Sequence, residues 1–181
     1  KVPPDLLAMR NSADVVLAIL LSARGEYQLA EQILFKTIRR DIAAAGTTAW
    51  HGLVEFAGVK RGDLVLAPGT GGVAIMALHI AKALGAQVAI TSSSDEKLER
   101  CRELGADFEV NYRSRPDWAA ALLEQTGGRG ADIVIDTIGL GEIEQTLAVA
   151  APNGRIALIG GLSGAPGHAP NMFGMIGKNL T

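Results

Sequence analysis

The chain has 181 residues, of which 48% are hydrophobic, 20% charged and 4% aromatic, so it can bury one substantial core. Seventeen Lys and Arg against nineteen Asp and Glu give a net charge of -2 with no block of like charge, which argues against nucleic-acid partners. The longest apolar run, residues 15–23, is far shorter than the roughly 20 residues that cross a bilayer, and the single cysteine closes no internal disulfide. We therefore expect no membrane span and a cytoplasmic location.

The first forty residues predict helices and no strand. One helix starts at residues 3–5 and stops near Gly25, and a second helical pattern continues to about Ala45. The second pattern carries apolar residues on one face, namely Leu29, Ile33, Leu34 and Ile38. Because no polar groups converge there, we interpret residues 1–42 as a helical packing segment of unknown role.

From residue 63 onward the pattern alternates between strands and helices. The expected strands are short aliphatic runs at residues 64–67, 87–91, 107–110, 132–135 and 155–159. The expected helices between them cover residues 72–84, 95–104, 116–126 and 141–150. This order is typical of an α/β fold with a doubly wound parallel sheet.

A glycine-rich turn directly follows the first of these strands. Residues 69–74 read Gly-Thr-Gly-Gly-Val-Ala, the GxGxxA pattern that joins a strand to a helix in dinucleotide-binding domains. Gly69 permits the tight turn, Gly71 lets backbone amides approach a pyrophosphate, and Ala74 lets the helix pack closely on the strand. The positive end of the helix dipole would face the phosphates, so we predict a dinucleotide site here.

The end of the second strand bears on which dinucleotide binds. NAD-binding domains place a carboxylate there, about 20 residues after the glycine turn, for the ribose 2′-hydroxyl. Here residues 91–94 read Thr-Ser-Ser-Ser, and Lys97 follows in the next helix. Hydroxyls, a helix start and Lys97 suit a 2′-phosphate, so NADP(H) is favoured over NAD(H). Ser94 is equally a helix cap, and Asp95 and Glu96 would repel a phosphate if they turned inward.

Taken together, these motifs resemble the cofactor domain of medium-chain dehydrogenases and reductases. The resemblance is to the zinc-type alcohol dehydrogenase and quinone oxidoreductase branch. It rests on residues 47–53, 62–63, 69–73, 91–98, 104–107, 111–112, 127–132 and 154–156. It implies an NAD(P)-binding Rossmann domain over residues 43–181 and does not cover residues 1–42.

The resemblance also implies parts that this sequence does not show. The family has a GroES-like catalytic domain, and none is recognisable here. Thr181 stands where the sixth strand of the family's sheet would begin. We therefore expect a Rossmann sheet truncated before its last strand, in a chain that is either a fragment or a protein whose catalytic half was replaced by a helical segment.

Cofactor contacts follow from the resemblance position by position. The family's nicotinamide-side contacts fall on Thr48, Val73, Thr137, Ile138, Gly160 and Gly161. Its pyrophosphate turn falls on Gly71, Gly72 and Val73, after the Gly69 turn. NADPH-using quinone reductases surround the 2′-phosphate with a lysine and a tyrosine, which Lys97 and Tyr112 match. Ser92 occupies the position of the missing acid.

The resemblance does not extend to a zinc site. In zinc-dependent members the residue four before the Thr48 position is a metal ligand, whereas here it is Ala44, which has no donor atom. Cys101 and His79 lie within predicted helices and are interpreted as packing or surface residues. No catalytic residue is assigned. Thr48 and His51 are three residues apart, so they can face the same side of a helix, and both are candidates for contact with substrate.

The function predicted from the sequence is an NADP(H)-binding domain of an oxidoreductase. It would support hydride transfer between nicotinamide and an alcohol or carbonyl, a quinone or an activated alkene. A small-molecule substrate would bind only together with the missing catalytic domain, so this chain alone is expected to be inactive. The alternative functions are a non-catalytic nucleotide-sensing module and an S-adenosylmethionine-dependent methyltransferase. The sequence is also compatible with a homo-oligomer.

Overall fold

The computed structural model describes residues 27–161 and 170–181. The chain divides into two compact units, residues 1–44 and 45–181, and the second contains the whole sheet. The first predicted helix lies outside the described residues. The second is α3, Tyr27–Trp50, which ends beyond the expected Ala45. Of its predicted apolar face, Leu29 is exposed, and the other three side chains lie outside the described part of the chain.

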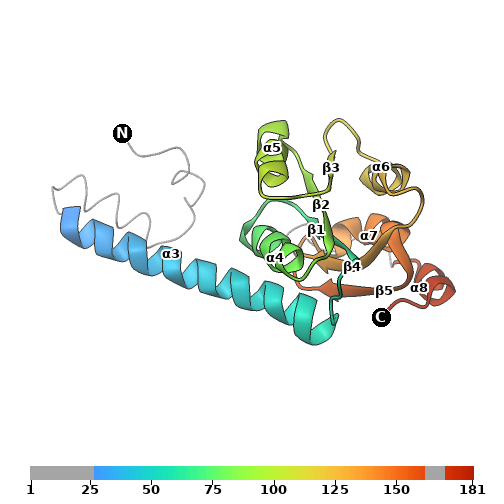
Figure 1. Cartoon of the computed structure of the whole chain (residues 1–181), viewed down its shortest axis with the longest axis horizontal. Coiled ribbons are helices and arrows are strands. Elements are labelled where there is room, and N and C mark those ends of the chain that lie inside the picture. Colours follow the sequence, from blue (N-terminus) through green and yellow to red (C-terminus); the bar gives the residue numbers. More distant parts are fainter. Residues whose placement is uncertain (1–26, 162–169) are drawn as a thin grey trace. The chain divides into compact units, whose positions relative to one another are not determined.

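Five parallel strands form the sheet, in the order β3-β2-β1-β4-β5 (Figure 1). Their bounds are β1 Leu64–Pro68, β2 Gln87–Ser92, β3 Phe108–Asn111, β4 Ala131–Asp136 and β5 Ala150–Leu158. The doubly wound parallel sheet predicted from the sequence is therefore confirmed. The chain builds outward from β1 in one direction and from β4 in the other, so a crevice opens between their carboxyl ends.

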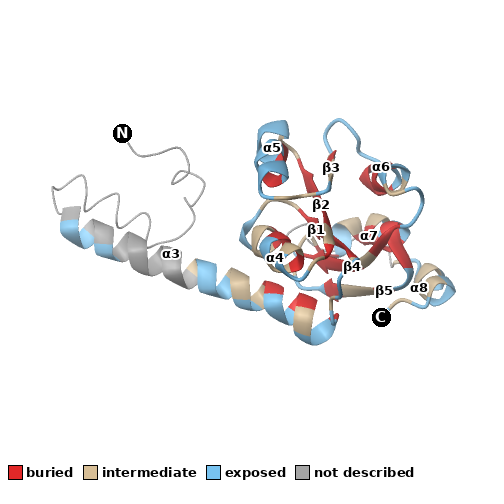
Figure 2. Ribbon diagram, viewed as in Figure 1, coloured by how far each residue is buried: buried red, intermediate tan, exposed pale blue. Residues whose placement is uncertain are grey.

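Helices cover both faces of this sheet. They are α4 Gly72–Ala83, α5 Asp95–Glu103, α6 Trp118–Gln125 and α7 Ile143–Val149, the last preceded by a 3₁₀ turn, Leu140–Glu142. Because side chains alternate along a strand, Val65 and Ala67 pack toward α4, whereas Leu64 and Leu66 pack toward α6. Burial on both faces explains the continuous aliphatic runs of the sequence, and Figure 2 shows the central strands as buried.

The end of α3 continues into a π-helical turn, η1, His51–Phe56. Ala49 and Leu53 are fully buried there. Gly52 lies so close to the sheet that a Cβ atom would come within 3.1 Å of the Ile135 side chain. This packing of η1 on the sheet explains why the helix passes its predicted end.

The last part of the chain differs most from prediction. β5 begins at Ala150 instead of residue 155, and α8, Met172–Lys178, was not predicted. Lys178 donates to three carbonyl oxygens at the end of α7. Thr181 exchanges backbone hydrogen bonds with Gly154 and Ile156 of β5. Nowhere in residues 27–161 or 170–181 is a helix long and apolar enough to cross a membrane.

Candidate functional site

The glycine-rich turn joins β1 to α4, as predicted. Gly69 has a φ of +88°, in the left-handed region that favours glycine. Gly71 is the N-terminal cap residue of α4 in an extended conformation, and a Cβ built on it would meet no atom within 4 Å. The space beside Gly71 is therefore open to a ligand, next to the free amides at the start of α4.

Hydrogen bonds tie this turn to the neighbouring strands. The backbone N–H of Gly69 donates to the buried hydroxyl of Thr91 in β2 over 3.2 Å. On the other side, the hydroxyl of Thr137, just after β4, donates to the carbonyl oxygen of Pro68 over 3.3 Å. The ends of three strands are thus fixed around the turn.

Asp136, the last residue of β4, organises the loop that follows it. Its side chain is fully buried. One carboxylate oxygen accepts from the backbone N–H groups of Ile138 and Gly139, and the other accepts from the hydroxyl of Thr146 on α7, each at 2.8 Å. These contacts satisfy the buried charge and fix the loop at residues 137–139.

The main chain of Asp136 also forms hydrogen bonds with the segment that follows β5. Its carbonyl oxygen accepts from the N–H groups of Ile159 and Gly160, at 2.8 and 3.1 Å. A Cβ on Gly160 would lie 1.9 Å from the carbonyl oxygen of Thr137. Only glycine lets the two strand ends approach so closely, so the loops after β4 and β5 form one rigid edge.

A cleft of about 520 Å³ opens at this edge of the sheet. Its walls come from the glycine turn, the segment after β3 and the loop after β4, and include Gly69, Gly71, Tyr112, Trp118, Thr137 and Ile138. Five of these six were predicted as cofactor contacts. The structure thus brings them together from three separate strand ends.

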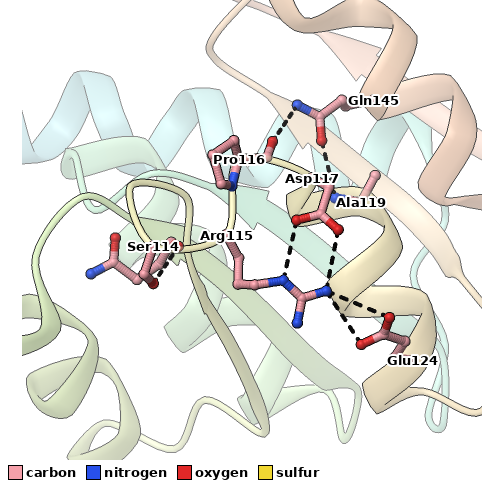
Figure 3. A network of polar contacts seen from close by, with 8 residues as sticks. Ser114, Arg115, Pro116, Asp117, Ala119, Glu124 and Gln145 are labelled. Atoms are coloured by element: carbon pink, nitrogen blue, oxygen red, sulfur yellow. Dashed lines mark hydrogen bonds and ion pairs between the residues drawn. The ribbon is translucent and has the colours of Figure 1, made fainter.

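A polar network holds one wall of the cleft (Figure 3). Gln145 on α7 donates to the carbonyl oxygen of Pro116 and accepts from the N–H of Ala119, at 3.0 and 3.2 Å. Arg115 contacts Asp117 through two nitrogens, at 3.1 and 3.2 Å, and holds the pKa of that carboxyl below its usual value. The segment between β3 and α6 is thereby fastened to both α6 and α7.

Of the predicted 2′-phosphate residues, Tyr112 lines the cleft just after β3, whereas Ser92 ends β2 and Lys97 lies in the first turn of α5. Ser92 is buried, and its hydroxyl accepts from the N–H of Ser94 over 3.3 Å. Ser94 caps α5 by accepting from the N–H of Lys97, which confirms its capping role. The backbone N–H of Tyr112 donates to the carbonyl oxygen of Ser92 over 3.0 Å. The Lys97 side chain is exposed and forms no ion pair with any described residue.

Thr48 and His51 line a different hollow. This groove, of about 770 Å³, lies between η1 and the end of β5. Its other residues include Glu55, Phe56 and Ile159. The predicted pairing of Thr48 with His51 on one helix face is present, whereas neither residue lines the cleft beside the glycine turn.

Cys101 and His79 were predicted to be packing or surface residues, and the structure agrees. Cys101 is buried, and burial raises the pKa of its thiol, which keeps it protonated at neutral pH. His79 is exposed on α4. Over the described ranges, no three His, Cys, Asp or Glu side chains are grouped so that they could hold a metal ion.

Asp136 was not predicted as a site residue, and Thr91 was predicted only as one of the hydroxyl residues near a phosphate, not as the acceptor for the Gly69 N–H. Each is a polar residue at the end of a buried aliphatic strand, and both are at most 1% exposed. An acid inside such a run is rarely buried without partners, so Asp136 could have been identified as an organising residue from the run Ile-Val-Ile-Asp alone. The partners Ile138 and Gly139 follow directly in sequence, whereas no sequence signal identifies Thr146, because it lies on α7.

Known proteins resemble this chain in both sequence and fold. The model of a family described as zinc-binding dehydrogenase matches residues 72–181. A zinc-type alcohol dehydrogenase-like protein of Schizosaccharomyces pombe is 43% identical over 141 residues, which make up 77% of this chain and 40% of that protein.

Solved structures agree with this match. An NAD-dependent alcohol dehydrogenase, 39% identical, superposes on 75% of this chain and 39% of its own, with a TM-score of 0.69. A mycobacterial quinone oxidoreductase, 31% identical, covers 77% of this chain and 43% of its own, also with a TM-score of 0.69. The chain thus spans about two fifths of the length of these relatives.

Proposed function

The chain belongs to the zinc-binding dehydrogenase family of medium-chain dehydrogenases and reductases, and from this premise we propose that it is an NADP(H)-binding domain of an oxidoreductase. The cleft beside Gly71 is the observation that carries the proposal. It lies at the carboxyl ends of β1 and β4, where doubly wound sheets bind their ligands.

The residues around the cleft fit a dinucleotide. The space beside Gly71 is open, and the backbone amides of Gly71 and Gly72 at the start of α4 would bind a pyrophosphate, whose charge the helix dipole would stabilise. Val73 lies in the same first turn. Thr137, Ile138, Gly160 and Gly161, on the rigid edge after β4 and β5, would contact the nicotinamide side.

When bound, reduced nicotinamide would donate hydride to a carbonyl, a quinone or an activated alkene, and oxidised nicotinamide would accept hydride from an alcohol. The protein's own work is to bind and orient. The hydrogen bonds of Asp136 fix the loop before any ligand arrives, so little ordering cost remains for binding. Thr48 and His51, in the groove beside β5, are the residues we propose for contact with substrate.

Selectivity for NADP(H) is proposed from the turn between β2 and α5. Ser92 stands where an acid would accept hydrogen bonds from the ribose hydroxyl of NAD, and Lys97 and Tyr112 lie nearby to meet a 2′-phosphate. One solved relative is described as NAD-dependent, so the preference proposed here would differ from that relative's.

Ser92→Asp is expected to narrow or reverse a preference for NADPH. The new carboxylate would accept hydrogen bonds from the ribose and repel the phosphate. A charge-assisted contact contributes about 1.5 to 3 kcal/mol, so the ratio of NADPH to NADH affinity should fall roughly tenfold or more. Parallel fluorescence titrations measure it. An unchanged ratio in a folded variant would place the selectivity elsewhere.

Zinc does not fit the described residues. Ala44, four residues before Thr48, has no donor atom, and no three His, Cys, Asp or Glu side chains among the described residues are grouped so that they could bind a metal ion. We propose that the 181-residue chain by itself holds no zinc and transfers no hydride at a measurable rate. Orienting a substrate against nicotinamide contributes roughly 7 to 11 kcal/mol of barrier lowering, and two residues in a separate groove cannot supply it.

Steady-state NADPH oxidation tests this, with a quinone, an aldehyde and an enone, in zinc-supplemented and metal-free buffer. We expect no turnover above the rate without protein. Turnover that Thr48→Ala abolishes would show that this chain assembles a complete active site.

A further inference from the structure

We propose that Asn111 sets the selectivity between NADP(H) and NAD(H) by holding the carboxylate of Asp95 at the end of β3. The inference rests on the proposed function, since it concerns how the 2′-phosphate is received at the turn between β2 and α5, residues 92–97. It assigns a role to Asn111 and Asp95, for which the resemblance gave no cofactor contact.

Two carboxylates compete with a phosphate at this turn. Asp95 and Glu96 are the first residues of α5, and both occupy the positive end of its dipole. A 2′-phosphate carries about -1.5 to -2 charges, as other phosphate monoesters do at neutral pH. Acids placed there would favour the ribose hydroxyl of NAD(H) unless other groups engage them.

Both carboxylates are engaged in the structure. Arg100 binds Glu96 one turn along α5, at 2.8 Å. The side-chain amide of Asn111 donates to Asp95 over 2.7 Å. The side chain of Lys97, the residue after Glu96, is exposed and binds neither Asp95 nor Glu96.

The orientation of Asn111 is fixed from two directions. Its amide oxygen accepts from the backbone N–H of Arg113 over 3.0 Å, so its amide nitrogen is the atom that faces Asp95. Asn111 is also the register partner of Ser92 across the β2–β3 pair. It therefore contacts the acid from a position paired with Ser92 on the neighbouring strand and directly before Tyr112 on its own, two of the proposed phosphate residues.

Loss of the Asn111 amide would release Asp95. The freed carboxylate could accept from a ribose hydroxyl and would repel a phosphate, so NADPH affinity should fall and NADH affinity should hold or rise. For partly exposed charges the interaction is modest, about 1 kcal/mol or less, so we expect the affinity ratio to change about fivefold.

A double-mutant cycle tests this role. The affinities of NADPH and NADH are titrated for wild type, Asn111→Ala, Asp95→Asn and the double variant. We expect Asn111→Ala to lower the NADPH to NADH ratio about fivefold, and Asp95→Asn to restore it in the double variant. Gln125→Ala is the matched control, because that amide also donates to β3, at the carbonyl oxygen of Glu109, and should leave the ratio unchanged.

The possible results distinguish a wrong role for Asn111 from a wrong proposal of NADP(H) binding. An unchanged ratio in Asn111→Ala, or an equal loss with and without the Asp95 carboxylate, overturns the role of Asn111 while leaving NADP(H) binding in place. A wild-type chain that is folded and prefers NADH, or binds neither dinucleotide, contradicts both proposals. Restoration by Asp95→Asn is the readout that a purely structural role for Asn111 would not give.

Discussion

Gly71→Val is expected to abolish measurable NADPH binding, with a loss of about a hundredfold or more, because it removes charge-assisted bonds between backbone amides and the pyrophosphate. The reason is local. A Cβ at Gly71 meets no protein atom within 4 Å, and the extended backbone there, with φ -80° and ψ 175°, accepts valine. The side chain would fill only the space proposed for the ligand.

Calorimetric titration measures the loss, with circular dichroism to show that the variant is folded. Gly177→Val is the matched control, since it makes the same substitution in open space on α8, outside the cleft lining. NADPH affinity that is equal in wild type and Gly71→Val would mean that the dinucleotide binds elsewhere.

Asp136→Leu is expected to lower the free energy of unfolding by about 3 kcal/mol or more. The substitution leaves two backbone N–H groups and the hydroxyl of Thr146 without their acceptor in a buried site, and each such loss costs about 1 to 3 kcal/mol. Urea unfolding followed by tryptophan fluorescence, to which the buried Trp118 contributes, measures the change.

Asp136→Asn tests whether hydrogen bonding, rather than side-chain size alone, stabilises this site. Its amide oxygen can accept from Ile138 and Gly139 while its amide nitrogen donates to the hydroxyl of Thr146, so we expect a loss below about 1.5 kcal/mol. If Asn costs as much as Leu, the acceptor geometry is not what stabilises the loop. If Leu costs under about 1 kcal/mol, the network contributes little.

The sheet was predictable because each strand is buried on both faces. The runs at residues 64–67, 87–91 and 132–135 became β1, β2 and β4 almost without shift. The family resemblance stated for residues 43–181 is confirmed by the family match at residues 72–181. The domain boundary after residue 42 remains a prediction.

Errors concentrate where tertiary contacts override local preference. The last strand was expected to begin at residue 155, yet β5 starts at Ala150 and passes an irregular register beside Ala131. No helix was predicted at residues 172–178, whereas Asn171 caps α8 at one end and Asn179, in the left-handed region, ends it. Neither outcome depends on hydrophobic spacing.

The site was predictable only in part, for a related reason. The glycine turn is continuous in sequence, so its geometry follows from a few neighbouring residues. The bonds from Asn111 to Asp95 and from Asp136 to Thr146 join different segments, and they exist only once strand register and helix placement are set. Fold-level patterns do not encode such pairs.

A calorimetric titration of the wild-type chain with NADPH, and in parallel with NADH, tests the central claim most directly. We expect saturable binding of one NADPH per chain, about tenfold to a hundredfold tighter than NADH, as one charge-assisted phosphate contact would give. A folded chain that binds neither dinucleotide, or binds NADH more tightly, would contradict it.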